Sequence, residues 1–189
     1  MDLLPLPTAR LLLRWFQPAD LDAFQAYRSD PVLARYQEWE PMSVAQASSF
    51  LAAQTHRTLD TAGQWLQVAV TLRESGQVIG DLGLCLTDES EGAVEIGVTM
   101  ARSAQGFGYA TEALTAMTEI LLNQAGVRSL VAVTDTRNIA AAALLRRVGF
   151  RHERTTATIF RGEPCQEQTF VLLKVSERAG SRPTSEAGR

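Results

Sequence analysis

The chain has 189 residues, of which 46% are hydrophobic and 21% charged, and its formal net charge is -3. These values are ordinary for a globular protein, and the length suits one domain with a sizeable core. The slightly acidic balance argues against nucleic-acid binding, which requires a basic face. No apolar run approaches the roughly 20 residues that span a bilayer, and the start of the chain lacks the basic region and apolar core of a signal peptide. We therefore expect a cytoplasmic protein that binds neither nucleic acid nor membranes.

Cysteine and histidine are sparse and scattered. Cys85 and Cys165 form no close pair and no metal-ligand spacing, so we expect reduced thiols and no metal site. His56 and His152 are isolated in the sequence, and each is expected to be structural or exposed rather than catalytic.

The first predicted elements are a strand and two helices. Residues 10–15 form a short apolar run with basic ends, which is typical of a strand. Pro18 favours the first position of a helix, and the Asp-Pro pair at 30–31 should end that helix. Residues 43–46 match a capping box, so a second helix is predicted from there to about Arg57.

Strand patterns follow. The segments 64–72, 77–86 and 93–100 are separated by short polar turns, which predicts an antiparallel meander. In the third strand the side chains should alternate between two faces, with Val94, Ile96, Val98 and Met100 on one and Glu95, Gly97 and Thr99 on the other.

The apolar period then changes to that of a helix. A helix is predicted over 110–121 with Gly126 as its stop, followed by a strand over 129–134. A further helix is predicted over 138–148, ending before Gly149.

The last ordered segment should be a hairpin with strands at 150–159 and 167–173 around a turn at 161–164. We expect a single domain over residues 1–175 and a disordered tail over 176–189, where no hydrophobic anchor remains. The predicted fold is α/β (α+β), with a mixed, mostly antiparallel central sheet and helices on both faces.

A glycine-rich loop joins the third strand of the meander to the next helix. Its residues are Gln105, Gly106, Phe107, Gly108, Tyr109 and Ala110. Glycines let the backbone turn its N–H groups outward, and the following helix adds its positive end, so the loop could bind a pyrophosphate. The alternative is that the glycines only make a tight turn. A P-loop is excluded because no lysine follows, and a dinucleotide fingerprint is excluded because Thr111 replaces a small residue and Asp135 is too distant.

This loop has the Gln/Arg-x-x-Gly-x-Gly/Ala form of the GNAT superfamily of acetyltransferases. Residues 95–97 before it, 111–114 after it and 145–150 farther on also resemble that superfamily, and the opening 8–14 resembles its ribosomal-protein (Rim-type) branch. The resemblance covers residues 8 to about 174. It implies an acetyl-CoA-dependent N-acetyltransferase that transfers an acetyl group directly to a primary amine, either a protein N-terminus or a small amine. Assembly as a homodimer is compatible with these features.

The resemblance also assigns the site residues that hold acetyl-CoA. The backbone of the glycine loop would cradle the pyrophosphate, while Met100, Ala101 and Asn138 would contact the pantetheine arm, which fills a gap between two splayed strands. Asn138 is equally a favoured N-cap for its helix, and both roles are compatible. Arg102, Arg146 and Arg147 are further candidates for phosphate contacts. Each also has an explanation without a ligand: Arg102 as a solvated loop residue, and Arg146 and Arg147 as cations that complement the C-terminal end of their helix.

Glu95 is the candidate catalytic residue, since a carboxylate near the acceptor can take the proton that an ammonium group must lose. Asp81 on the neighbouring strand is the second candidate. The proton donors common in the superfamily are absent, because Ala141 and Leu145 stand at their positions. A non-catalytic acyl-CoA sensor and a nucleotide-dependent oxidoreductase remain as alternatives. The segment 17–57 should line the acceptor side of the site. Four aromatic residues are candidates for the wall of the acceptor pocket: Trp15, Tyr36, Trp39 and Trp65.

Overall fold

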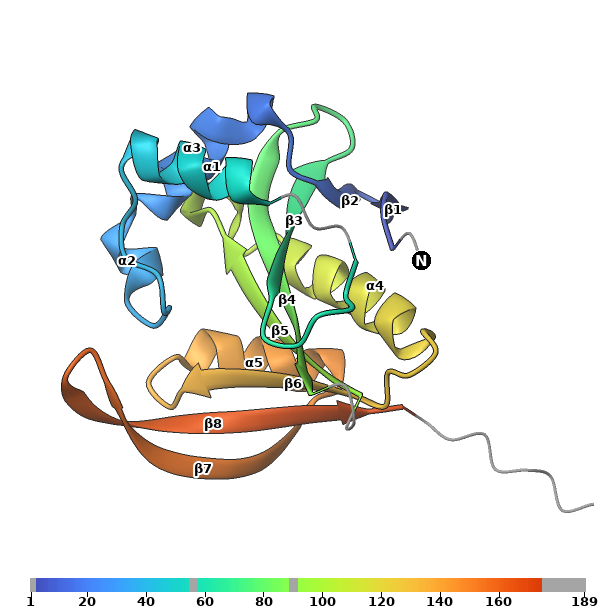
Figure 1. The fold of residues 1–189 in the computed structure, drawn as a ribbon, viewed down its shortest axis with the longest axis vertical. Coiled ribbons are helices and arrows are strands. Elements are labelled where there is room, and N and C mark those ends of the chain that lie inside the picture. Colours follow the sequence, from blue (N-terminus) through green and yellow to red (C-terminus); the bar gives the residue numbers. More distant parts are fainter. Residues whose placement is uncertain (1–2, 55–57, 89–91, 175–189) are drawn as a thin grey trace, which may run out of the picture.

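A computed structural model describes residues 3–54, 58–88 and 92–174 of the chain. Its centre is an eight-stranded sheet in the order β1-β2-β3-β4-β5-β6-β8-β7 (Figure 1). The strands are β1 (Leu6–Pro7), β2 (Leu11–Trp15), β3 (Trp65–Leu72), β4 (Val78–Asp88), β5 (Ala93–Met100), β6 (Ser129–Asp135), β7 (Arg151–Phe160) and β8 (Glu163–Leu173). The helices are α1 (Leu21–Arg28), α2 (Pro31–Ala34), α3 (Val44–Ala53), α4 (Tyr109–Leu122) and α5 (Ile139–Val148), with 3-10 turns at Pro18–Asp20 and Arg102–Ala104.

The pairing of the strands confirms the predicted mixed, mostly antiparallel sheet. Strands β2 to β5 form the antiparallel meander, and only β5 and β6 pair in parallel within the part of the chain that the structure describes. A doubly wound nucleotide-binding fold needs repeated parallel βαβ units. The sheet therefore excludes the oxidoreductase alternative.

Two apolar clusters show that helices cover both faces of the sheet. The larger cluster packs the even-numbered side chains of β3 to β5, such as Leu82 and Ile96, against Met117 of α4 and Leu145 of α5. The smaller cluster lies on the opposite face and packs Ala69 of β3 against side chains of α1 and α3, including Phe24, Tyr27 and Ala47. The odd-numbered side chains of β5, including Glu95, therefore point to the face that carries α1 and α3.

The capping and proline residues identified in the sequence lie at helix ends in the structure. Ser43 caps α3, its side chain accepting from the Gln46 N–H while the Gln46 side chain accepts from the Ser43 N–H. Pro31 closes off α1 as predicted but also starts the unpredicted turn α2, whose N-cap is Asp30. Helix α3 ends at Ala53. The prediction of a helix to about Arg57 is therefore too long, because Gln54 is already the C-cap. Arg57 itself, His56 and the predicted tail over 176–189 lie outside the described residues.

Two further boundary predictions were wrong. Helix α4 ends at Leu122 and not at Gly126, because the N–H groups of Asn123 and Gln124 close the last turn by bonding back to Glu119 and Leu121. The hairpin turn is also shorter than predicted: Arg161 and Gly162 both have positive φ, as a two-residue turn requires, so β8 already begins at Glu163. None of the helices in the described ranges is long and apolar enough to cross a membrane.

Candidate active site

The sheet opens where β5 and β6 stop pairing. The two strands pair only from Ala93 with Ser129 to Glu95 with Val131, although β5 continues to Met100 and β6 to Asp135 (Figure 1). The ends of the two strands therefore form a wedge with Glu95 at its apex.

One edge of this wedge presents backbone groups of β5. The Ala101 N–H donates to the Ile79 carbonyl on β4, 2.9 Å away. Because backbone groups alternate in direction along a strand, Met100 and Val98 turn theirs away from β4 and toward the wedge. The Met100 carbonyl also accepts from the Gln105 side chain at 3.0 Å. Sequence reasoning named Met100 and missed Val98, which the alternation could have indicated.

The glycine loop lies at the open end of the wedge. It follows the 3-10 turn after β5 and continues into the first turn of α4, whose N-cap is Gly108. Gly106 and Gly108 have φ of 84° and 80°, a conformation that glycine adopts without strain. Gly108 offers no side-chain cap, so the first N–H groups of the 14-residue helix α4 stay open for an anion. The loop thus has the local geometry that the sequence predicted.

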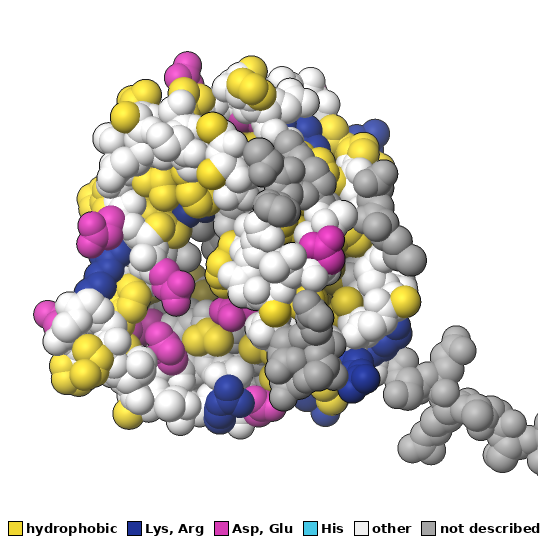
Figure 2. All heavy atoms as spheres, in the orientation of Figure 1, with side chains coloured by type: hydrophobic (Ala, Val, Ile, Leu, Met, Phe, Trp, Pro, Cys, Tyr) yellow, Lys and Arg dark blue, Asp and Glu magenta, His cyan; other side chains and the backbone are white. Residues whose placement is uncertain are grey.

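A cavity of about 360 Å³ opens on the α1–α3 face of the sheet, beside the wedge. In the space-filling view this face is hollowed, and acidic side chains gather around the hollow (Figure 2). Charged and aromatic side chains from separate elements line it: Arg28, Tyr36, Glu38, Trp39, Trp65, Asp81, Glu95, Asp135 and Glu167. Three of the four aromatic wall candidates, Tyr36, Trp39 and Trp65, line this cavity, whereas Trp15 packs against the larger core cluster.

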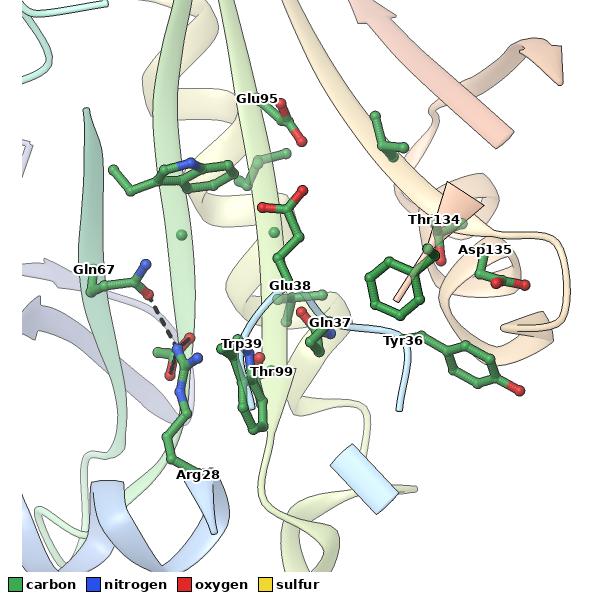
Figure 3. Close-up of a pocket in the computed structure, with 18 of the residues that line it drawn as sticks. Arg28, Tyr36, Gln37, Glu38, Trp39, Gln67, Glu95, Thr99, Thr134 and Asp135 are labelled. Carbon is green, nitrogen blue, oxygen red and sulfur yellow. Dashed lines mark hydrogen bonds and ion pairs between the residues drawn. The ribbon is translucent and has the colours of Figure 1, made fainter. Parts of the chain in front are cut away.

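Glu95 is half-buried in this cavity, and its carboxylate faces that of Glu38 (Figure 3). Burial raises the pKa of Glu95, and the negative charges of Glu38 and Glu167 raise it further. None of these three glutamates forms an ion pair with another described residue. Sequence reasoning missed Glu38 and Glu167, which only the fold brings near Glu95.

Asp81, the second catalytic candidate, is held by other side chains. Both of its oxygens accept from Arg28 Nη2, at 3.0 and 2.9 Å, and one also accepts from the Tyr27 hydroxyl at 2.6 Å. All three residues are buried. These bonds make Asp81 part of a structural ion pair between α1 and β4.

The cysteines and His152 lie outside the cavity lining. Cys85 stands opposite Glu95 on β4, and the pKa of its thiol is raised by burial and by the charge of Glu95. Cys165 lies on the terminal hairpin, where it faces Thr158. His152 is exposed and contacts Thr155 and Phe170.

Helix α5 borders the other side of the wedge. Asn138 is its N-cap and accepts from the Ala141 N–H at 3.2 Å. Leu145 is buried in the larger core cluster, so this position faces the core. Arg146 lies over the Phe170 ring, and Arg147 reaches Thr111.

Comparison with known proteins identifies the family. The acetyltransferase (GNAT) domain matches residues 10–151. The chain belongs to the GNAT acetyltransferase family and is an N-acetyltransferase by class.

Individual relatives agree with this assignment. The uncharacterised N-acetyltransferase p20 of Bacillus licheniformis is 29% identical over 147 residues, which cover 77% of this chain and 82% of the relative. RimL, a ribosomal L7/L12 alpha-N-protein acetyltransferase solved with coenzyme A, has a TM-score of 0.77 at 18% identity, covering 89% of this chain and 97% of its own. A spermidine N-acetyltransferase from Vibrio cholerae, solved with CoA and spermine, has a TM-score of 0.75 at 16% identity, covering 88% and 97%.

Proposed function

We propose that this protein transfers the acetyl group of acetyl-CoA directly to a primary amine of a cationic acceptor, with Glu95 as the proton acceptor. One observation carries the proposal: a half-buried carboxylate with a raised pKa stands at the apex of the wedge and opens into an acidic cavity. The remaining support comes from the groups that surround the wedge.

The wedge and the glycine loop support acetyl-CoA as the co-substrate. The loop, from Gln105 to Ala110, would hold the pyrophosphate through its outward N–H groups and the start of α4. Met100 and Val98 would contact the pantetheine arm along the open edge of β5, and Asn138 would approach it from α5. Ala101 would keep the end of the strand in place through its bonds to Ile79 and Ala104. Structural neighbours solved with CoA are consistent with this use of the fold.

Acetyl-CoA supplies an activated acyl group as a thioester. An alkylamine with a pKa near 10.4 must lose a proton before it attacks, which costs about 4.6 kcal/mol at pH 7. Glu95 would accept that proton directly or through water, and its raised pKa makes it a stronger base than an exposed glutamate. Because Leu145 faces the core and Ala141 has no donor group, the departing thiolate would take its proton from solvent.

The residues around the cavity support a cationic acceptor. Glu38, Glu95 and Glu167 carry negative charges that no described arginine or lysine neutralises by an ion pair, so a positive group is attracted there. Tyr36 and Trp39 lie in the same lining, but arginines of this chain already contact their rings, Arg35 and Arg137 at Tyr36 and Arg28 at Trp39. The glutamates therefore carry the case for an amine with a second positive charge.

Direct transfer is supported by the placement of the thiols. Neither Cys85 nor Cys165 lines the cavity, and the raised pKa of Cys85 keeps its thiol protonated near neutral pH. No covalent relay is therefore required between the thioester and the amine.

A pair of amines matched in length tests this proposal. Thiol release from acetyl-CoA would be followed with 1,5-diaminopentane and with pentylamine, which lacks the second charge. We expect kcat/KM to be about tenfold higher for the diamine, since one more charge near the glutamates contributes about 1.4 kcal/mol. Initial rates with the diamine should give intersecting double-reciprocal lines.

Two outcomes would contradict the proposal in different ways. Parallel lines, with exchange of labelled CoA into acetyl-CoA when no amine is present, would mean a covalent acetyl-enzyme and not direct transfer. Tight CoA binding with no thiol release from any amine, including a peptide with a free N-terminus, would favour the acyl-CoA sensor, and the missing donors at Ala141 and Leu145 would then explain the loss of activity.

A further inference from the structure

One arginine outside the glycine loop contacts three consecutive residues within it. Arg10, just before β2, donates from Nη1 to the Phe107 carbonyl at 2.9 Å. Its Nη2 lies 3.5 Å from the position that a Cβ on Gly108 would take. Its guanidinium carbon stands 4.5 Å from the centre of the Tyr109 ring, which in turn stacks on the Phe107 ring. A single side chain from the start of the chain therefore holds the loop on both sides of Gly108.

Glu112 fixes this arginine in place. One oxygen of Glu112 accepts from Arg10 Nε at 2.6 Å, and the other accepts from the Arg10 backbone N–H at 2.7 Å and from the Thr8 hydroxyl at 2.6 Å. Partial burial opposes ionisation of Glu112, but the bonds from Thr8 and Arg10 outweigh it and lower the pKa of the carboxyl. The carboxylate thus orients the guanidinium and stays charged.

The negative charge of Glu112 lies close to the proposed diphosphate site. Glu112 lies in the first turn of α4, next to the open N–H groups that would bind a pyrophosphate. An unpaired carboxylate there would repel an anionic ligand, and Arg10 cancels that charge at contact distance. An exposed ion pair contributes little to the stability of the fold. The main effect of the Arg10–Glu112 pair is therefore on the position and charge of the glycine loop.

We infer that Thr8, Arg10 and Glu112 form a positioning cluster for the CoA diphosphate: Glu112 orients Arg10, and Arg10 holds the glycine loop open and neutralises the start of α4. This inference rests on the proposed function, because it assumes that the loop binds the diphosphate of acetyl-CoA. Its distinctive consequence is that the cluster should matter only for ligands that carry the diphosphate.

The test compares coenzyme A with S-acetylpantetheine, which lacks the diphosphate. Calorimetric titration of the full chain with CoA should show a Kd about tenfold higher for Arg10→Ala than for wild type. The kcat/KM for S-acetylpantetheine with the diamine should stay within twofold of wild type. In the double variant Arg10→Ala/Glu112→Gln, the CoA Kd should recover in part, because the unpaired carboxylate is gone. Arg154→Ala is the matched control, since Arg154 lies on β7 and pairs there with the exposed Glu153.

Four other results would contradict the inference or the proposed function. An unchanged CoA Kd in Arg10→Ala would overturn the inference, and so would an equal loss with CoA and with S-acetylpantetheine, which would indicate a general folding defect. If Glu112→Gln alone binds CoA as wild type does, the orienting role of the carboxylate is wrong. A wild-type protein that fails to bind CoA would instead refute the proposed function on which the inference depends.

Discussion

The carboxylates of this protein fall into two sets that differ in whether an arginine holds them. Asp81 and Asp135 bond to Arg28 and Arg137, as Glu112 does to Arg10. The glutamates of the cavity, with Glu95 at their centre, have no such partner within the described ranges. Asp81 and Asp135 also line the cavity, so carboxylates there stabilise the fold where an arginine holds them and leave charge available for a ligand where none does.

The pKa directions follow this division with opposite consequences for stability. Hydrogen bonds from Arg137 lower the pKa of Asp135, so its stabilising effect is present above the ordinary carboxyl pKa and is lost as pH falls through the lowered value. Burial and neighbouring charge raise the pKa of Glu95, so its ionised form costs stability, and that cost appears as pH rises through the raised value. Removing a charge from each set should therefore have different effects.

The largest effect on stability is expected where a paired carboxylate is removed. Asp81→Asn would leave the guanidinium of Arg28 buried without its counter-charge, and we expect the free energy of unfolding to fall by about 3–5 kcal/mol. Urea denaturation followed by circular dichroism measures this loss. Glu153→Gln, which removes the exposed partner of Arg154, is the control and should change stability by less than about 1 kcal/mol. Equal losses in the two variants would mean that the buried pair contributes no more to stability than an exposed pair does.

The unpaired set should show the opposite behaviour at Glu95. Glu95→Gln is expected to lower turnover about a hundredfold near neutral pH, with partial recovery as pH rises toward the pKa of the amine. The free energy of unfolding at neutral pH should not fall, because the variant loses a charge that the fold disfavours. Thiol-release kinetics and urea denaturation measure the two quantities on the same preparation.

A wild-type rate across that pH range would rule out Glu95 as the base. A loss of CoA affinity with unchanged chemistry would point to a role in shaping the wedge. Glu163→Gln serves as the control, because Glu163 is an exposed carboxylate that does not line the cavity.

A smaller effect should separate Glu95 from its neighbours. Glu38 raises the pKa of Glu95 by its negative charge, so Glu38→Gln should lower that pKa and move the acidic limb of the kcat/KM profile to lower pH. The same shift is expected for Glu167→Gln and not for Glu163→Gln on the same strand. An unshifted limb in both cavity variants would mean that the limb reports another group.

Local patterns in the sequence were enough for the framework of the site. The alternation over β5 put Glu95 on the opposite face from Ile96, and the glycine pair indicated a turn before a helix, where both glycines have positive φ. Asn138 was recognised as an N-cap because a side-chain acceptor at that position completes the first turn. These predictions hold because each depends on residues within a few positions of one another.

The features that were missed depend on contacts between distant segments. Nothing near Glu38 or Glu167 in the sequence marks them as neighbours of Glu95, since the meander, the α2–α3 connection and the last hairpin bring them together. The contact of Arg10 with Phe107 is equally long-range. Even Asp81, correctly placed beside the site, could not be recognised as a structural ion pair until Arg28 of α1 was seen against it.

The smallest effect is expected for the thiols, and it tests whether the chemistry belongs to the carboxylates alone. Cys85 lies directly opposite Glu95 across β4 and β5, so it is the thiol nearest to the proposed base by register. Burial and the charge of Glu95 both raise the pKa of Cys85, and a protonated thiol is a poor nucleophile toward a thioester. The double variant Cys85→Ser/Cys165→Ser should therefore retain thiol release within about threefold of wild type, with any loss accounted for by the less favourable burial of a hydroxyl at Cys85. A folded double variant that loses activity about a hundredfold would instead assign a covalent step to a cysteine. The two single variants would then identify the reactive cysteine. The glutamates of the cavity would be left with acceptor binding as their only role.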